Sequence, residues 1–175
     1  MDEIIAPWAE SACLPMYDDG EITWWSKGNS SFLERTLNAL EQEIGVDFTK
    51  VKKKKNAEIR HTKVKSFDNP YQLGNAYWHP NNPIWKLKTI RGKKHRSTLL
   101  HEFGHAFGLQ HPADHFANQD TIMSYQRDRK ICNFFERDKN AIKRIYTDPS
   151  LEFADIKAWP IDIDELTGIV NVDYI

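Results

Sequence analysis

Apolar residues recur every three or four positions over residues 31–44, which is the period of an amphipathic helix. These apolar positions are Leu33, Leu37, Leu40 and Ile44. Ser31 and Glu34 have the spacing of a capping box at the amino end, and Gly45 is the kind of residue that ends a helix. The pattern therefore predicts a helix that begins at Ser31 and ends before Gly45.

Two later segments share the helical period, and strand-forming residues lie before the first helix and between the first and second helices. Helices are predicted over residues 93–108 and 136–146, with Leu99, Leu100, Phe103, Ala106, Phe107, Ile142 and Ile145 on their buried sides. Strands are predicted over residues 21–25, 46–48, 57–61 and 73–78. This order predicts an α/β (α+β) fold, in which a mixed twisted β-sheet packs with two long helices and a third, carboxy-terminal helix.

Charge is distributed unevenly along the chain, although the net charge is only −1. Basic residues gather in residues 50–55 and 86–96, and acidic residues dominate after Ser150. Such runs are typical of solvated loops. We therefore divide the chain into an amino-terminal arm (1–20), a central domain (21–148) and an acidic tail (149–175). The tail could add a strand, wrap the domain or dock on a partner.

Composition excludes several classes of protein. The 175 residues are 40% hydrophobic and 12% aromatic, which is typical of one globular domain. No apolar run is long enough to span a membrane, and no basic patch dominates the chain, so we expect no membrane span and no nucleic-acid partner. No classical signal peptide is visible, so we expect a cytoplasmic, virion-associated or non-classically exported protein.

Two cysteines, Cys13 and Cys132, are too few for a disulfide framework. They could be free thiols, or they could form a single bridge that tethers the amino-terminal arm.

One short segment has the composition of a catalytic metal site. His101 and His105 are four residues apart on a predicted helix, so both imidazoles face the same side. Gly108 can adopt a left-handed conformation and reverse the chain, which would bring His111 to the same ion. Three imidazoles leave one position open on a tetrahedral zinc, as in catalytic rather than structural sites. Glu102 lies where it can contact a water molecule at that position.

This motif, with Gly108 and the third histidine, resembles the signature of the metzincin clan of zinc endopeptidases. Ten to fourteen residues after His111, Thr121-Ile122-Met123-Ser124-Tyr125 resembles the clan's Met-turn, whose methionine lies beneath the three histidines. Pro112 directly after the third histidine and Tyr125 two positions after the methionine resemble the residues at the same places in the serralysins. The predicted layout of strands and helices resembles both serralysins and matrix metalloproteinases. The resemblance covers roughly residues 20–148.

The resemblance implies one catalytic zinc ion, a peptide or protein substrate, and endopeptidase activity. It implies that Glu102 acts as the general base and that Tyr125 stabilises the oxyanion. Substrates of such enzymes lie along an edge strand, here residues 74–78, with Ala76 and Tyr77 as candidate main-chain contacts. Phe116 and Phe134 are candidates for the specificity pocket.

Some features differ from the family pattern. Residues 81–96, between the last predicted strand and the zinc helix, are short and basic and have a single histidine, so we expect no second zinc and no calcium site there. The other histidines, His61, His79, His95 and His115, lack metal-binding spacing and are expected to be surface or strand residues. Two alternatives to an endopeptidase stay open: a zinc-binding structural or binding module of a larger assembly, and an amidase acting on cell-wall peptides.

Overall fold

Five strands form one mixed sheet in the computed structural model, which describes residues 4, 20–79, 82–92, 95–112 and 120–147. The strands are β1 (Glu21–Ser26), β2 (Asp47–Lys50), β3 (Ile59–Val64), β4 (Gly74–His79) and β5 (Asn82–Ile90). Their order across the sheet is β2-β1-β3-β5-β4. All neighbours are parallel except β4 and β5, which are antiparallel. The predicted mixed sheet is therefore confirmed, and β4 lies at its edge.

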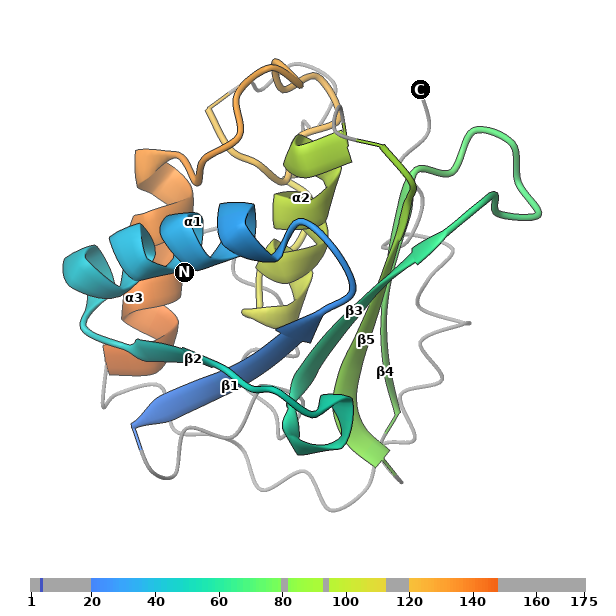
Figure 1. Ribbon diagram of the computed structural model, residues 1–175. Coiled ribbons are helices and arrows are strands. Elements are labelled where there is room, and N and C mark those ends of the chain that lie inside the picture. The colour runs from blue at the N-terminus through green and yellow to red at the C-terminus, as the bar shows by residue number, and fades with distance from the viewer. Residues whose placement is uncertain (1–3, 5–19, 80–81, 93–94, 113–119, 148–175) are drawn as a thin grey trace.

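Three α-helices lie together beside one face of this sheet (Figure 1). They are α1 (Ser30–Ile44), α2 (Arg96–Ala106) and α3 (Glu136–Thr147), and a short 3-10 helix, η2 (Lys54–Asn56), joins β2 to β3. α2 packs against β4 and β5, whereas α1 packs against β2 and α3. No helix of the described part of the chain is long and apolar enough to cross a bilayer.

The predicted apolar positions of the helices form the core. Leu33, Leu37, Leu40 and Ile44 of α1 are buried, as are Ile142 and Ile145 of α3. α1 ends as expected: Gly45 has a φ of 75°, and its N–H donates to the Glu41 carbonyl. This left-handed conformation is one that glycine adopts at little cost.

The predicted capping box at the start of α1 is wrong. The helix begins one residue earlier than expected, after Asn29, which has a left-handed φ of 57°, and no side chain caps it. Glu34 instead accepts a hydrogen bond from Lys50 Nζ at 2.9 Å. The lysine on the neighbouring strand offers the carboxylate a charged partner, which local sequence could not reveal.

The basic stretch 86–96, predicted as a loop, begins within the strand β5, which includes its residues 86–90. Trp85, Leu87 and Thr89 are buried, whereas Lys86 and Lys88 between them are exposed. This alternation is the period of a strand with one buried face. The lysines suggested a solvated loop because they occupy the exposed positions of the strand.

His61 of β3 is a buried strand residue that bridges three neighbouring strands. The Ser26 hydroxyl donates to the Gly28 carbonyl, so Nδ1–H of His61 donates to Ser26 Oγ at 2.7 Å. His61 Nε2 then accepts from the Thr89 hydroxyl at 2.9 Å. Burial, and secondarily the charge of Lys63, lowers the pKa of His61 from 6.5 to about 3. The folded protein therefore holds this imidazole neutral.

We predict that this histidine makes the fold sensitive to acid. Between pH 6.5 and 3 the unfolded chain binds a proton that the folded His61 cannot, so the free energy of unfolding falls as the pH decreases. The loss attributable to His61 is about 1.4 kcal/mol per pH unit. Denaturant unfolding of the wild type and His61→Gln, with chelator present throughout, should show a flatter pH dependence for the variant between pH 6 and 4. Equal slopes would contradict the prediction.

Candidate metal site

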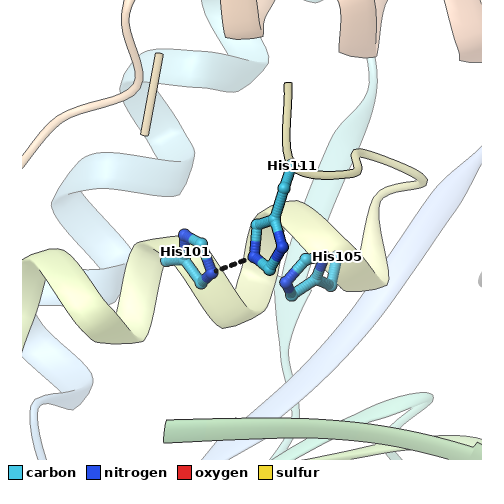
Figure 2. A group of neighbouring side chains, drawn as sticks. All are labelled: His101, His105 and His111. Atoms are coloured by element: carbon cyan, nitrogen blue, oxygen red, sulfur yellow. Dashed lines mark hydrogen bonds between the residues drawn. The ribbon is translucent and has the colours of Figure 1, made fainter. Parts of the chain in front are cut away.

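Two imidazoles of the site come from α2 and the third from the chain reversal that follows it (Figure 2). His101 and His105 are buried on α2, one turn apart. Gly108 has a φ of 93°, and the Leu109 N–H donates back to the Gly104 carbonyl at 2.9 Å. This reversal brings His111 over α2, and the ligand nitrogens of the three histidines lie within 4.8 Å of one another.

The loop that carries His111 is also held from the amino-terminal arm. The Gln110 N–H donates to the Ile4 carbonyl at 2.9 Å, and the Ile4 side chain is buried. A residue more than one hundred positions away thus contacts the backbone next to the third histidine.

Backbone carbonyls orient the two helical histidines. His101 Nδ1 lies 2.9 Å from the Ile122 carbonyl, and His105 Nδ1 lies 2.9 Å from the Leu109 carbonyl. A carbonyl oxygen can only accept, so each Nδ1 carries a proton and each Nε2 is left as the ligand atom of the neutral ring. His101 Nε2 and His111 Nε2 are 3.0 Å apart. Two ligands of a tetrahedral zinc lie about 3.3 Å apart, so the donor set fits zinc.

Burial and nearby positive charge keep His101 neutral. Burial is the main reason that the pKa of His101 lies well below its usual value, followed by the positive charge of Arg127 and by the neighbouring imidazoles. Neutral imidazole is the form that binds a metal ion.

Arg127 is a buried residue that the sequence motif did not indicate. Its Nε donates to Ser97 Oγ at 3.0 Å and its Nη1 donates to the Ser124 carbonyl at 2.6 Å. It therefore connects the first turn of α2 to the chain beyond Met123.

The predicted acid and tyrosine both lie at this cluster. Glu102 is buried on α2 beside His101, and its carboxylate approaches Gly74 on β4. Tyr125 Oη lies 3.2 Å from His111 Nδ1, and the two rings are 4.5 Å apart between centroids. Tyr125 is half-buried, so its hydroxyl borders the site rather than the core.

Residues 121–124 form a tight turn, here called the Met123 turn. The Ser124 N–H donates to the Thr121 carbonyl at 3.3 Å, and the Met123 N–H donates to Thr121 Oγ1 at 3.0 Å. Met123 is fully buried, and a Cβ added to Gly104 would lie 2.5 Å from its sulfur. Gly104 is three residues after His101 and lies next to it on the helix surface, so the sulfur packs directly against the helix that carries His101 and His105.

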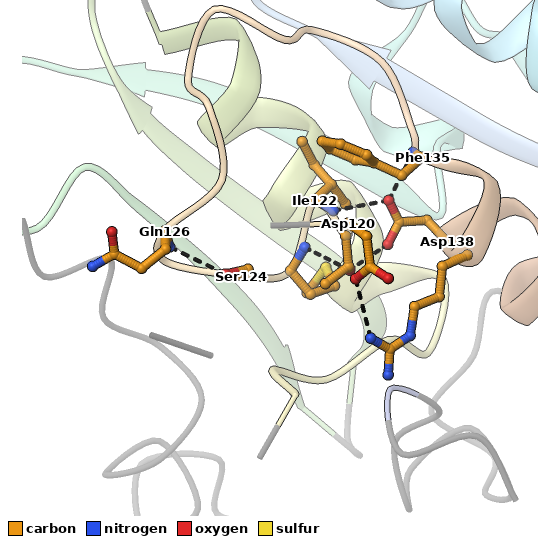
Figure 3. Close-up of polar contacts among 9 residues, drawn as sticks. Asp120, Ile122, Ser124, Gln126, Phe135 and Asp138 are labelled. Atoms are coloured by element: carbon orange, nitrogen blue, oxygen red, sulfur yellow. Dashed lines mark hydrogen bonds and ion pairs between the residues drawn. The ribbon is translucent and has the colours of Figure 1, made fainter. Parts of the chain in front are cut away.

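A buried carboxylate on α3 holds this turn in place (Figure 3). Asp138 accepts hydrogen bonds from Thr121 Oγ1 at 2.5 Å, the Ile122 N–H at 2.8 Å and the Phe135 N–H at 2.8 Å. Burial raises the pKa of Asp138 to about 6, while these hydrogen bonds act in the opposite direction. The only sequence signal was an acid in the first turn of a predicted helix, which is common without such a role.

The other candidate residues lie in different places. Ala76 and Tyr77 are on the edge strand β4, with Ala76 buried and Tyr77 half-buried. Phe134, suggested for a specificity pocket, is instead buried in the core beside Phe107, with ring centroids 6.1 Å apart. Phe116 lies outside the described residues.

Cys13, one end of the suggested Cys13–Cys132 bridge, also lies outside the described residues. Cys132 is half-buried in the segment before α3, where its thiol lies 3.5 Å from the Lys130 carbonyl.

The architecture is that of a zinc metallopeptidase. It combines a mixed sheet that has an antiparallel edge strand with a buried helix that contributes two of three clustered imidazoles. The family model of Matrixin, peptidase family M10, matches residues 22–147, which include the five strands except Glu21 of β1, the three α-helices and the histidine cluster. The chain belongs to this family, whose members are zinc-dependent peptidases that act on peptides and proteins. No curated protein matches the chain significantly.

We predict that Asp138→Asn loosens the Met123 turn. An amide offers one acceptor oxygen where the carboxylate uses two, and its NH₂ group would face a backbone or hydroxyl donor. Near pH 8, this mismatch should lower the free energy of unfolding by about 1–3 kcal/mol and weaken zinc binding. Unfolding curves and competition with a chromogenic chelator measure both effects.

Arg137→Gln is the matched control, because it removes the partner of the exposed Asp120 from the same helix and leaves the Asp138 carboxylate in place. Such a pair contributes at most about 1 kcal/mol. Equal effects of the two substitutions would show that Asp138 has no special role.

Proposed function

We propose that this chain is a zinc-dependent endopeptidase in which His101, His105 and His111 bind one zinc ion. The observation that carries the proposal is the arrangement of the three imidazoles. Their ligand atoms converge, and backbone carbonyls fix the tautomer of the two rings on α2. Zinc, when bound, supplies a Lewis acid that activates water and polarises the scissile carbonyl.

Glu102 is the proposed general base. Its carboxylate is on the turn of α2 next to His101 and is almost completely buried. In this role it accepts a proton from the attacking water and later delivers it to the leaving amine. A purely structural zinc site has no need of a buried acid at this position, which favours the catalytic proposal over the structural alternative.

Tyr125 and Met123 have supporting roles in the proposal. The Tyr125 hydroxyl, now beside His111, would donate a hydrogen bond to the oxygen that becomes negatively charged as the peptide carbonyl is attacked. Met123 would form the apolar floor of a Met-turn, which is supported by its burial and its close packing on Gly104.

The edge strand β4 is the proposed binding site for the substrate backbone. β5 pairs with one side of β4, and β4 ends the sheet on the other side. An extended peptide can add to such an edge through main-chain hydrogen bonds, with Ala76 and Tyr77 as the proposed contact residues. α2 packs on β4, so a peptide on this edge would lie close to the histidine cluster.

We predict that Glu102→Gln abolishes most activity but leaves zinc bound. Loss of general-base catalysis typically costs a factor of 10²–10⁴, whereas the three imidazoles are unchanged. The measurements are zinc content and kcat/KM on a peptide library, with Glu136→Gln, an exposed glutamate of α3, as the control. Full activity of the Glu102→Gln protein would refute the assignment.

Testing the zinc-loaded wild type on a protein and on a muropeptide, with and without chelator, separates the alternatives. Cleavage of the muropeptide alone would indicate the amidase. A zinc-loaded protein that cleaves neither substrate would support the structural module.

We also predict a milder effect of Tyr125→Phe. The change removes one hydrogen-bond donor and keeps the ring that packs on His111, so kcat should fall by about 10- to 100-fold while KM changes little. Steady-state kinetics on the best substrate from the library provide the test. A rise in KM by a similar factor, with kcat unchanged, would instead show that the hydroxyl acts in substrate binding.

A further inference from the structure

Gly74, the first residue of β4, lies against the carboxylate of Glu102. A Cβ built on Gly74 would lie 2.9 Å from Glu102 Cδ, closer still to Oε1, and 2.7 Å from Thr98 Cγ2. Real Cβ atoms essentially never make contacts under 3.0 Å. Thr98 and Glu102 are four residues apart on α2, so both project from the same face of the helix onto this glycine.

Backbone conformation does not account for a glycine here. The positive φ angles of the described chain include those of Gly20, Gly28, Gly45, Gly92 and Gly108, but not that of Gly74. Gly74 is a regular strand residue, opposite Thr89 of β5. A glycine inside a strand reduces stability, because it packs no side chain and loses more entropy on folding. Its advantage at this position is therefore the space that it leaves.

The carboxylate occupies that space between two elements that converge from distant parts of the sequence. Glu102 is buried, and so are Gly74 and Thr98, which take part in the same contact. A buried side chain packed against a strand backbone in this way has few alternative rotamers. The same contact places the acid at the beginning of the edge strand that we assign to the substrate.

We propose that Gly74 is a positioning residue for Glu102. Its missing side chain creates a slot in β4 that seats the carboxylate between the ligand helix and the substrate strand. This inference rests on the proposed function for its catalytic consequence, but the slot itself is a property of the fold. Any larger residue at position 74 displaces the acid, and displacement of a catalytic group by about 1 Å can reduce the rate about 100-fold.

The first experiment tests for the slot by measuring protein stability and does not depend on activity. Gly74→Ala, Glu102→Ala and the double variant are unfolded with denaturant as full-length protein at a fixed excess of zinc. If the slot holds the carboxylate, Gly74→Ala lowers the unfolding midpoint clearly in the wild type. It lowers the midpoint less when residue 102 is alanine, because the added methyl group then meets only Thr98 Cγ2, at 2.7 Å. Asn75→Ala, the next residue of β4, controls for general damage to the strand.

The ordinary expectation for this substitution has the opposite sign. Glycine to alanine at an unstrained site stabilises a protein, because it restricts the unfolded chain. An unchanged or higher midpoint for Gly74→Ala would therefore overturn the inference. The same fall in both backgrounds would also overturn it, because the clash would then not involve Glu102.

The second experiment measures positioning in the zinc-loaded enzyme. Gly74→Ala should lower kcat by about 10- to 100-fold with little change in KM or zinc content. In a Glu102→Asp background the shorter acid reaches less far into the slot, so the same substitution should lower kcat by a smaller factor. An equal factor in both backgrounds would overturn the positioning role.

The two experiments also separate the inference from the proposed function. If the effect of Gly74→Ala on the unfolding midpoint depends on residue 102, while the Glu102 variants keep full activity, the general base is refuted and the slot is confirmed. If that effect is the same in both backgrounds and the Glu102 variants are inactive, the slot is refuted and the proposed base is unaffected.

Discussion

The ligand helix α2 is enclosed by protein on every side, and the geometry of the histidine cluster follows from that enclosure. All residues from Ser97 to Ala106 are buried, although the helix has only eleven residues. β4 and β5 pack against it, and the Met123 turn contacts it at Gly104. At two of these contacts a glycine replaces a side chain: Gly74 faces Glu102, and Gly104 faces the Met123 sulfur. Since close-packed groups cannot shift independently, the positions of the imidazoles and the acid are set by the same packing.

Polar contacts around the cluster add orientation to this packing. The backbone carbonyls of Ile122 and Leu109 select the tautomers of His101 and His105. The Ile122 carbonyl is itself positioned by Asp138, which binds the N–H of the same residue from α3. A chain of contacts therefore connects α3 to the imidazole of His101. Ligands oriented in this way lose little entropy when a metal ion binds.

Local patterns predicted the elements whose signals lie within one turn or one strand. The three α-helices, the glycine that ends α1 and four of the five strands were found in this way, with boundaries that moved by a few residues. β5 was missed because its exposed lysines concealed a strand alternation. The capping box failed because Glu34 has a partner on β2, and the sequence does not show that Phe134 packs beside Phe107 in the core.

The amino-acid sequence by itself determined the chemistry of the candidate site, because a helix repeats every 3.6 residues and glycine alone reverses the chain cheaply. Those two facts place His101 and His105 on one face of a helix and allow Gly108 to turn His111 back toward them. Only the tertiary structure decided what surrounds them. The slot at Gly74, the Asp138 anchor, the buried Arg127 and the contact of Ile4 with the His111 loop each join residues at least 16 positions apart. Such contacts depend on how the sheet, α2 and α3 pack. The short-range periodicity of a sequence does not indicate which distant residues this packing brings into contact.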